Sequence, residues 1–250
     1  MTTAGVGIIC KTPRKGASKT RLQGVLSQQA CADLAGSFLI DVSAAIEALP
    51  ASVGHRGYAV YAPEGSEAEL ARFLPASFGL VCRRDATLGV VLLGATEELL
   101  RHGHDCAVLV NADSPTLPTV LLERTISALR APGDRVVLGP ATDGGYYLIG
   151  LKRPHARLFA DIAWSTPAVL GQTIERAGEI GLPVEQMPMW YDVDDAASLS
   201  TLLDEFESNR PPAGCAGTAG GPAHATRRLL QGIPDLGERV QSTLAAVADR

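Results

Sequence analysis

The sequence lacks the features that mark membrane and secreted proteins. No stretch approaches the ~18 consecutive apolar residues that a membrane span needs. The first residues show no basic segment followed by an apolar run and a cleavage site, so no signal peptide is expected. The sequence therefore favours a cytoplasmic protein that does not bind a membrane.

Cysteine and histidine are scarce. The five cysteines are odd in number and no two are close in sequence. We therefore interpret them as reduced thiols, mostly in the core, and not as a disulfide framework. His102 and His104 lie in a short glycine-containing turn and are interpreted as surface residues, not metal ligands. The sequence shows no recognisable Ser/His/Asp or Cys/His arrangement for nucleophilic catalysis.

The formal net charge of −5 argues against a general nucleic-acid binder. An anionic small substrate remains compatible with it, because basic loops can lie on an acidic protein. Hydrophobic residues make up 46% of the chain and charged residues 20%, which is ordinary for a globular domain.

Short apolar runs alternate with longer helical patterns along most of the chain. Strands are predicted at residues 6–10, 58–61, 78–82, 107–110, 135–138, 146–151 and 183–187. Helices are predicted at 28–49, 67–73, 88–101, 119–129, 167–177 and 196–206. This alternation predicts a three-layer α/β/α fold with a mostly parallel central sheet. Ligands of such sheets bind beyond the carboxyl ends of the strands.

The composition changes near the C-terminal end. Of the 15 residues 211–225, 12 are Pro, Gly or Ala. We therefore predict a domain at 1–207, a flexible linker at 208–225 and a tail at 226–250. The tail contains one predicted helix with an apolar face, Leu236, Val240, Leu244 and Val247. It could dock on the domain, mediate self-association such as a homodimer, or stay loose.

A basic loop follows the first predicted strand. Residues 11–22 contain five cations and no acid. Phosphate oxygens favour cationic side chains, hydroxyls and backbone N–H groups that converge from one loop. The order is not that of a Walker A loop, and the chain has no GxGxxG segment. A phosphate-binding loop and a solvated surface loop are about equally compatible with the composition; the candidate phosphate ligands are Lys11, Arg14, Gly16, Ser18, Lys19, Thr20 and Arg21.

Two acidic segments could hold a metal ion. Asp113 emerges at the end of the clearest apolar strand, where one or two carboxylates, together with phosphates and water, suit Mg²⁺. It could instead begin an Asx turn. Asp192, Asp194 and Asp195 repel one another unless a cation or hydrogen bonds hold them. They either complete a metal site with Asp113 or cap the helix that follows.

Two further segments could contact an acceptor. In one, Asp143, Gly144, Gly145 and Tyr146 lie between two predicted strands, where the glycines could let backbone amides approach a ligand. A plain hairpin turn explains the same residues almost as well. In the other, Trp164 could face a substrate or pack in the core, and Ser165 or Thr166 could cap a helix with Pro167 in its first turn.

Five segments in this order resemble one family. They are Lys-Thr-Pro-Arg-Lys-Gly-Ala-Ser-Lys-Thr-Arg-Leu (11–22), Asn-Ala-Asp-Ser-Pro-Thr-Leu-Pro (111–118), Gly-Pro-Ala-Thr-Asp-Gly-Gly-Tyr-Tyr-Leu-Ile-Gly-Leu (139–151), Trp-Ser-Thr-Pro (164–167) and Asp-Val-Asp-Asp (192–195). Over about residues 5–206 the chain resembles the DUF2064 proteins, also called rSAM/selenodomain-associated transferase 1. More distantly it is similar to phospholactate guanylyltransferases and molybdenum-cofactor nucleotidyltransferases.

The resemblance implies a glycosyltransferase A-type (GT-A) fold of the nucleotide-diphospho-sugar transferase superfamily. It implies that Lys11, Lys19 and Arg21 contact nucleotide phosphates and that Asp113 and Asp194 hold Mg²⁺ or Mn²⁺. The chain departs from the family at 85–90, where a Gly-Asp-Leu-Gly-Glu-Arg-like block is altered. A similar block, residues 234–239, lies in the tail instead.

Three functions are therefore considered. The first is nucleotidyl transfer from a nucleoside triphosphate to a small anionic acceptor that carries a phosphate or phosphonate, with Lys19 and Arg21 stabilising the departing pyrophosphate. The second is glycosyl transfer from a nucleotide sugar to a hydroxylated acceptor that Asp143 activates or orients. The third is a non-catalytic nucleotide-binding module. The five cations slightly favour the first, because a triphosphate carries more charge than a sugar diphosphate.

Overall fold

The core of the protein is one mixed β-sheet. The computed structural model describes residues 2–84, 87–215, 217 and 219–248. Within them, a seven-stranded sheet has the order β3-β2-β1-β4-β6-β5-β7. The strands are β1 (Ala4–Lys11), β2 (His55–Ala62), β3 (Gly79–Cys82), β4 (Cys106–Asn111), β5 (Val136–Pro140), β6 (Tyr146–Leu151) and β7 (Val184–Gln186).

The sheet is mostly parallel, as predicted. Strands β1 to β4 pair in parallel, and β5 pairs in parallel with β7. Strand β6 runs antiparallel to both β4 and β5. The reversal follows from the short connection between β5 and β6, since a tight turn can join only antiparallel strands.

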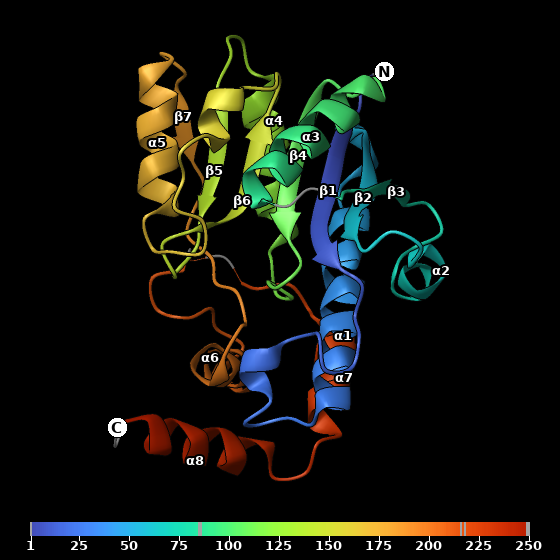
Figure 1. Ribbon diagram of the computed structural model, residues 1–250, viewed down its shortest axis with the longest axis vertical. Coiled ribbons are helices and arrows are strands. Elements are labelled where there is room, and N and C mark those ends of the chain that lie inside the picture. Colours follow the sequence, from blue (N-terminus) through green and yellow to red (C-terminus); the bar gives the residue numbers. More distant parts are fainter. Residues whose placement is uncertain (1, 85–86, 216, 218, 249–250) are drawn as a thin grey trace.

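Helices cover both faces of the sheet (Figure 1). The helices are α1 (Gln28–Glu47), α2 (Glu67–Leu70), α3 (Leu88–Arg101), α4 (Thr119–Arg130), α5 (Val169–Glu179), α6 (Ala196–Ser208), α7 (His224–Gln231) and α8 (Leu236–Ala248). Helices α1 and α4 share one apolar cluster with the sheet, and α3 and α5 share the other. The predicted three-layer α/β/α fold is confirmed.

Helix α1 shows why a predicted amphipathic segment folds as it does. The Ser27 side chain accepts a hydrogen bond from the Ala30 N–H at 3.1 Å and so caps the helix. Every fourth residue then faces the core: Leu34, Phe38, Val42 and Ile46, each 0% exposed. By length and composition this helix could also cross a membrane, yet 61% of its most apolar window is buried inside the protein. A core helix of an α/β domain passes the same test.

The last part of the chain packs on the domain through two helices. The expected single tail helix is wrong: α7 precedes α8, and the packing lies between α1 and α7 and between α6 and α8. The carboxylate of Asp41 in α1 accepts the backbone N–H groups of Ala225 and Thr226, at 2.9 and 2.8 Å. Arg239 of α8 donates to the carbonyl oxygen of Val25, just after the basic loop. The block at 234–239 thus opens α8 and reaches the domain.

Two smaller expectations need correction, and the expectation of reduced cysteines, mostly in the core, is confirmed. Helix α5 begins at Val169, later than predicted, and its N-cap is Ala168 without a side-chain hydrogen bond, so neither Ser165 nor Thr166 caps it. His104 is half-buried between Thr3 and Tyr58, whereas His102 is exposed as expected. All five cysteines are free thiols, and Cys82 and Cys215 are only half-buried.

Candidate active site

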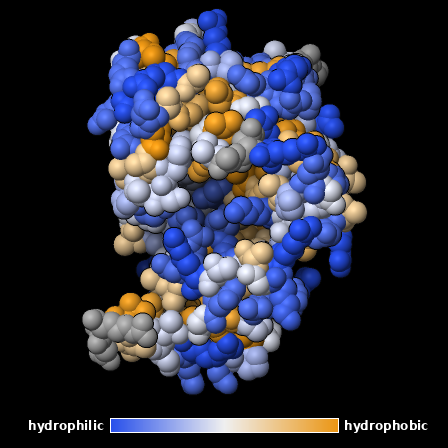
Figure 2. Space-filling model, in the orientation of Figure 1, coloured by the Kyte–Doolittle hydropathy of each residue, from blue (hydrophilic) through white to orange (hydrophobic). Residues whose placement is uncertain are grey.

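A cavity opens at the carboxyl ends of the central strands. Its volume is about 630 Å³, and it lies where β1, β2 and β4 end. Figure 2 shows a hydrophilic hollow on this face, between the sheet and the helices beyond its carboxyl end. The cavity lies where ligands of open α/β sheets are expected.

Strand pairing brings the two predicted ligand loops together. Strands β1 and β4 are neighbours in parallel register, with Ile9 opposite Asn111. Their carboxyl ends therefore open at the same edge, and the basic loop faces the loop that carries Asp113. The cavity is lined by residues of both loops, including Lys11, Ser18, Lys19, Thr20, Arg21 and Asp113.

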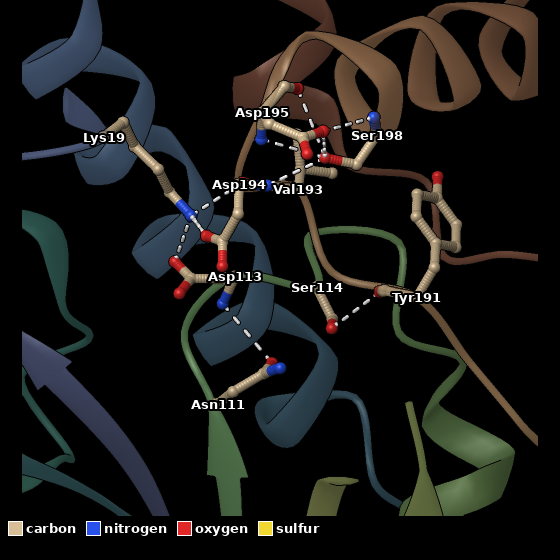
Figure 3. A network of polar contacts seen from close by, with 9 residues as sticks. All are labelled: Lys19, Asn111, Asp113, Ser114, Tyr191, Val193, Asp194, Asp195 and Ser198. Carbon is tan, nitrogen blue, oxygen red and sulfur yellow. Dashed lines mark hydrogen bonds and ion pairs between the residues drawn. The ribbon is translucent and has the colours of Figure 1, made fainter. Parts of the chain in front are cut away.

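Lys19 joins the two predicted metal carboxylates (Figure 3). Its Nζ lies 2.6 Å from Asp113 Oδ1 and 2.9 Å from Asp194 Oδ1. Burial alone would lower the pKa of this ammonium, but the charges of both carboxylates and their hydrogen bonds outweigh burial and raise it. Lys19 is therefore charged at neutral pH and compensates the pair.

Backbone contacts bring Asp194 to Asp113 although 80 residues separate them. The Val193 N–H donates to the Asp113 carbonyl oxygen at 2.8 Å. The Ser114 hydroxyl donates to the Tyr191 carbonyl oxygen at 2.8 Å. These bonds hold the segment before α6 against the end of β4.

The three adjacent acids have different roles. Asp195 caps α6, since its carboxylate accepts the Ser198 N–H at 2.9 Å and the Ser198 hydroxyl bonds back in a capping box. Asp194 instead turns toward Lys19. Burial, with the nearby charges of Asp143, Asp194 and Asp113, raises the pKa of Asp192 to about 7. Asp195 thus provides the helix cap, whereas Asp194 lies beside Asp113 and Lys19, where the metal-site alternative would need it.

Asp113 does not form the Asx turn itself. Its own N–H donates to the Asn111 side-chain oxygen at 3.3 Å, so Asn111 closes the turn. The Asp113 carboxylate is left for Lys19 and the cavity.

Part of the basic loop points elsewhere. Arg14 makes a bidentate pair with Glu69 of α2, with Nε at 3.0 Å and Nη2 at 2.9 Å. The Ser18 hydroxyl accepts the Arg14 N–H at 2.9 Å, which tightens the loop. Gly16 has φ 79°, which favours glycine, and neither it nor Arg14 lines the cavity. The cations that reach the cavity from this loop are Lys11, Lys19 and Arg21.

The predicted acceptor residues lie outside this cavity lining. Strands β5 and β6 form a hairpin, and Asp143 accepts the Gly145 N–H at 2.8 Å within its turn. Gly144 has φ 89°, and a Cβ there would lie 2.4 Å from the Pro167 carbonyl oxygen. The turn therefore needs glycine for its own packing. Asp143 remains exposed at the edge of the acidic group.

Three other predicted residues lie around that hairpin. Tyr146 packs on the sheet face that α5 covers, with its hydroxyl buried. The Trp164 ring lies against Gly89 in the first turn of α3. A Cβ on Gly89 would be only 3.0 Å from Trp164 Cζ2. Ser165 has φ 63°. Of the altered segment before α3, Asp85 and Ala86 lie outside the described residues.

Arg83 is a cavity residue that the sequence reasoning missed. It follows β3 directly, and its N–H donates to the Tyr61 carbonyl oxygen at 2.9 Å. Its guanidinium lies over α3, since a Cβ on Gly94 would be 2.0 Å from Arg83 Nη2. Arg83 could have been predicted as a site residue, because ligands bind at the carboxyl ends of strands. The space that Gly94 leaves for its guanidinium could not be foreseen.

The geometry does not include a larger cluster of metal ligands. Within the described part of the chain, no group of three or more His, Cys, Asp or Glu side chains could hold a metal ion. Asp113 and Asp194 form a pair, and each keeps a partly exposed side chain, 38% and 43%. A pair suits an ion that takes its remaining ligands from water and phosphates.

Solved structures show that this fold is that of the nucleotide-diphospho-sugar transferases. A proposed nucleotide-diphospho-sugar transferase from Desulfovibrio desulfuricans G20 is 24% identical, with a TM-score of 0.79, 97% of this chain and 98% of that chain covered. A CMP:2-keto-3-deoxy-manno-octonic acid synthetase complexed with CTP is 10% identical, with a TM-score of 0.54 and 83% and 99% covered. A cytidylyltransferase from Leptospira borgpetersenii serovar Hardjo-bovis (strain JB197) is 11% identical, with a TM-score of 0.51 and 94% and 97% covered.

Residues 45–166 match the family described as "Uncharacterized protein conserved in bacteria (DUF2064)". The resemblance to DUF2064 is thus confirmed over this segment. It contains Asp113 and the Gly144–Gly145 turn, but it excludes the basic loop and Asp194. No curated protein matches the chain.

Proposed function

We propose that the protein is a metal-dependent nucleotidyltransferase. Its substrates would be a nucleoside triphosphate and a small acceptor that carries a phosphate or phosphonate. One observation carries the proposal: the cavity at the carboxyl ends of the strands is lined by the cations Lys11, Lys19, Arg21 and Arg83, beside the carboxylates Asp113 and Asp194. This charge pattern suits a polyphosphate that arrives with a divalent cation.

The donor set suits Mg²⁺ or Mn²⁺. One oxygen of Asp113 and one of Asp194 already converge on a single cationic nitrogen, at 2.6 and 2.9 Å. These two residues would hold the ion. When bound there, it would neutralise phosphate charge.

The chain itself mainly supplies position and charge. An acceptor oxygen attacks the α-phosphorus, the bond from that phosphorus to the bridging oxygen breaks, and pyrophosphate leaves. Lys11 and Arg21, on the exposed side of the loop, bind the phosphates and stabilise the negative charge on the leaving group. Placement of the two substrates lowers the barrier without covalent chemistry from the protein.

The fold comparisons support this proposal at the level of the superfamily. One structure of the same fold is a synthetase complexed with CTP, and another is a cytidylyltransferase.

Glycosyl transfer from a nucleotide sugar is the second candidate. Asp143 favours it, because its exposed carboxylate lies near the acidic group that includes Asp192 and could orient an acceptor hydroxyl. The D. desulfuricans protein with the same fold has nucleotide-diphospho-sugar transfer as its proposed activity.

A thermal-shift screen separates these candidates. The full chain is heated with ATP, GTP, CTP or UTP, or with UDP- or GDP-sugars, each with and without Mg²⁺ or Mn²⁺. A ligand that binds only the folded state raises the Tm by mass action. We expect one triphosphate with metal to raise the Tm more than any nucleotide sugar.

The other outcomes have defined meanings. A Tm increase with a nucleotide sugar alone would overturn nucleotidyl transfer in favour of glycosyl transfer. No shift with any ligand would overturn both.

A further inference from the structure

The ammonium group of Lys19 has a full set of acceptors. Besides Asp113 Oδ1 and Asp194 Oδ1, at 2.6 and 2.9 Å, it donates to the Val193 carbonyl oxygen at 2.7 Å. An ammonium group has three N–H donors. Each donor therefore has a partner, all three supplied by the protein (Figure 3).

The surroundings of Lys19 fix this arrangement. Its side chain is only 6% exposed, whereas those of Asp113 and Asp194 are 38% and 43% exposed. The Nζ also lies over the Phe38 ring, 5.1 Å from its centroid. The Lys19 backbone is left-handed, φ 46° and ψ 47°, which a non-glycine residue adopts only when its surroundings hold it. The cation thus lies beneath two carboxylates that open to the cavity.

We propose that Lys19 is a resident cation that prevents the Asp113–Asp194 pair from binding a divalent cation alone, so that the metal binds only together with an anionic nucleotide. The proposal rests on the proposed function, since it assigns that site an order of binding. Lys19 would then be a positioning residue in the ligand-free protein, and not simply one more phosphate contact.

The reason is charge balance. The two carboxylates carry two negative charges, and Lys19 offsets one of them at contact distance. A divalent cation bound to the same carboxylates would lie close to the ammonium and be repelled by it. Nucleotide phosphates supply the missing negative charge, so metal and nucleotide raise each other's affinity reciprocally.

Binding of free Mn²⁺ to the full-length protein tests this without any activity assay. Electron paramagnetic resonance counts unbound Mn²⁺ during a titration of wild type and Lys19→Met, with no nucleotide present. We expect weak binding by wild type and, for Lys19→Met, at least about tenfold tighter binding, within the usual range for coupled sites.

Two further variants sharpen the titration. Lys15→Met removes a cation from an exposed position of the same loop, outside the cavity lining, and should bind Mn²⁺ as wild type does. Lys19→Met combined with Asp113→Asn should lose the gain. If Lys19→Met does not fold, Lys19→Gln keeps a neutral polar side chain and takes its place.

Either of two results would overturn the proposal: tight Mn²⁺ binding by wild type alone, or no gain when Lys19 is neutralised. An equal gain in Mn²⁺ affinity in Lys15→Met and Lys19→Met would overturn it too. The gain would then come from the loss of any positive charge in the loop and not from Lys19 in particular. Failure of the proposed function looks different. In that case no nucleotide raises the Tm of wild type, while the Mn²⁺ gain in Lys19→Met still appears.

Discussion

The two ends of β4 each carry an aspartate paired with a cation, yet the pairs differ in what surrounds them. Before the strand, Asp105 accepts from Arg130 Nε at 2.8 Å and from Nη2 at 3.2 Å. The same guanidinium also donates to carbonyl oxygens of residues 2, 53 and 54. After the strand, Asp113 pairs with Lys19 beside a cavity of about 630 Å³.

The difference shows that an ion pair by itself does not mark a site. Arg130 uses its donors to tie the loop before β2 to α4. The side chains of Asp105 and Arg130 are 24% and 27% exposed. Asp113 keeps an exposed side chain at the carboxyl end of the strand, where loops converge. We therefore expect the amino end of β4 to serve stability and its carboxyl end to serve binding.

The largest effect is expected from Asp113→Asn. It removes one of two carboxylates from the candidate metal pair, so metal-dependent nucleotide affinity should fall on the order of 100-fold or more. The Tm should fall only modestly, because Lys19 keeps the Asp194 carboxylate and the Val193 carbonyl oxygen as acceptors. Isothermal titration with Mg²⁺ and the nucleotide found by the thermal screen measures the loss.

Asp33→Asn is the matched control for that variant. Asp33 is an exposed carboxylate on α1 outside the cavity lining, and its loss should leave affinity unchanged. Normal metal-dependent binding by Asp113→Asn would show that the metal assignment is wrong.

Asp105→Asn should have the opposite profile. It weakens a charge-assisted pair and leaves the partly buried Arg130 under-satisfied, so unfolding free energy should fall by about 1–3 kcal/mol. Nucleotide affinity of the folded protein should not change. Urea denaturation with a parallel binding titration measures both quantities, and a loss of affinity at unchanged stability would contradict the comparison.

The pH dependence of stability gives an independent check on Asp105. Burial would raise the pKa of its carboxyl, but the hydrogen bonds and charge of Arg130 outweigh burial and hold it below the ordinary 3.8. A carboxylate whose pKa is lowered by folding stabilises the protein above its unfolded pKa and loses that contribution as pH falls through the folded pKa. The stability difference between wild type and Asp105→Asn should therefore be constant above about pH 5 and shrink below about pH 4.

The smallest effect is expected from Gly94→Ala, which sharpens the account of the cavity. The new Cβ would displace the Arg83 guanidinium, which is the far end of a long side chain. Nucleotide affinity should drop about threefold to fivefold, the scale of one partly exposed ion pair.

Gly171→Ala, where a Cβ meets open space on α5, is the control for helix stabilisation without a change in affinity. Unchanged affinity in Gly94→Ala would remove Arg83 from the binding site.

Much of the fold follows from local patterns. The apolar run Ala107–Val110 predicts β4 within one residue at each end, and residues 88–101 form α3 as predicted. The tail was less predictable, because α7 is short and polar and is held by Asp41, a partner distant in sequence. The reversed strand β6 also depends on the turn before it, which the pattern of strands alone does not orient.

The site was predictable in part. Both Lys19 and Asp113 follow apolar strands, so their place at the ligand end could be inferred. The direct pairing of Lys19 with Asp113 could not be inferred from the sequence. It depends on β1 and β4 being neighbours and on the Val193 N–H bonding to Asp113. The roles expected for Arg14, Gly16 and the residues around Asp143 remain predictions.

The bond between Val193 and Asp113 also bears on how the protein is made. Chains emerge from the ribosome N-terminal end first. The basic loop, the strand before Asp113 and most of the sheet are therefore synthesised while Asp194 is still absent. A nascent chain that ends before Asp194 can pair Lys19 only with Asp113. The site is completed when the segment leading into α6 has been translated.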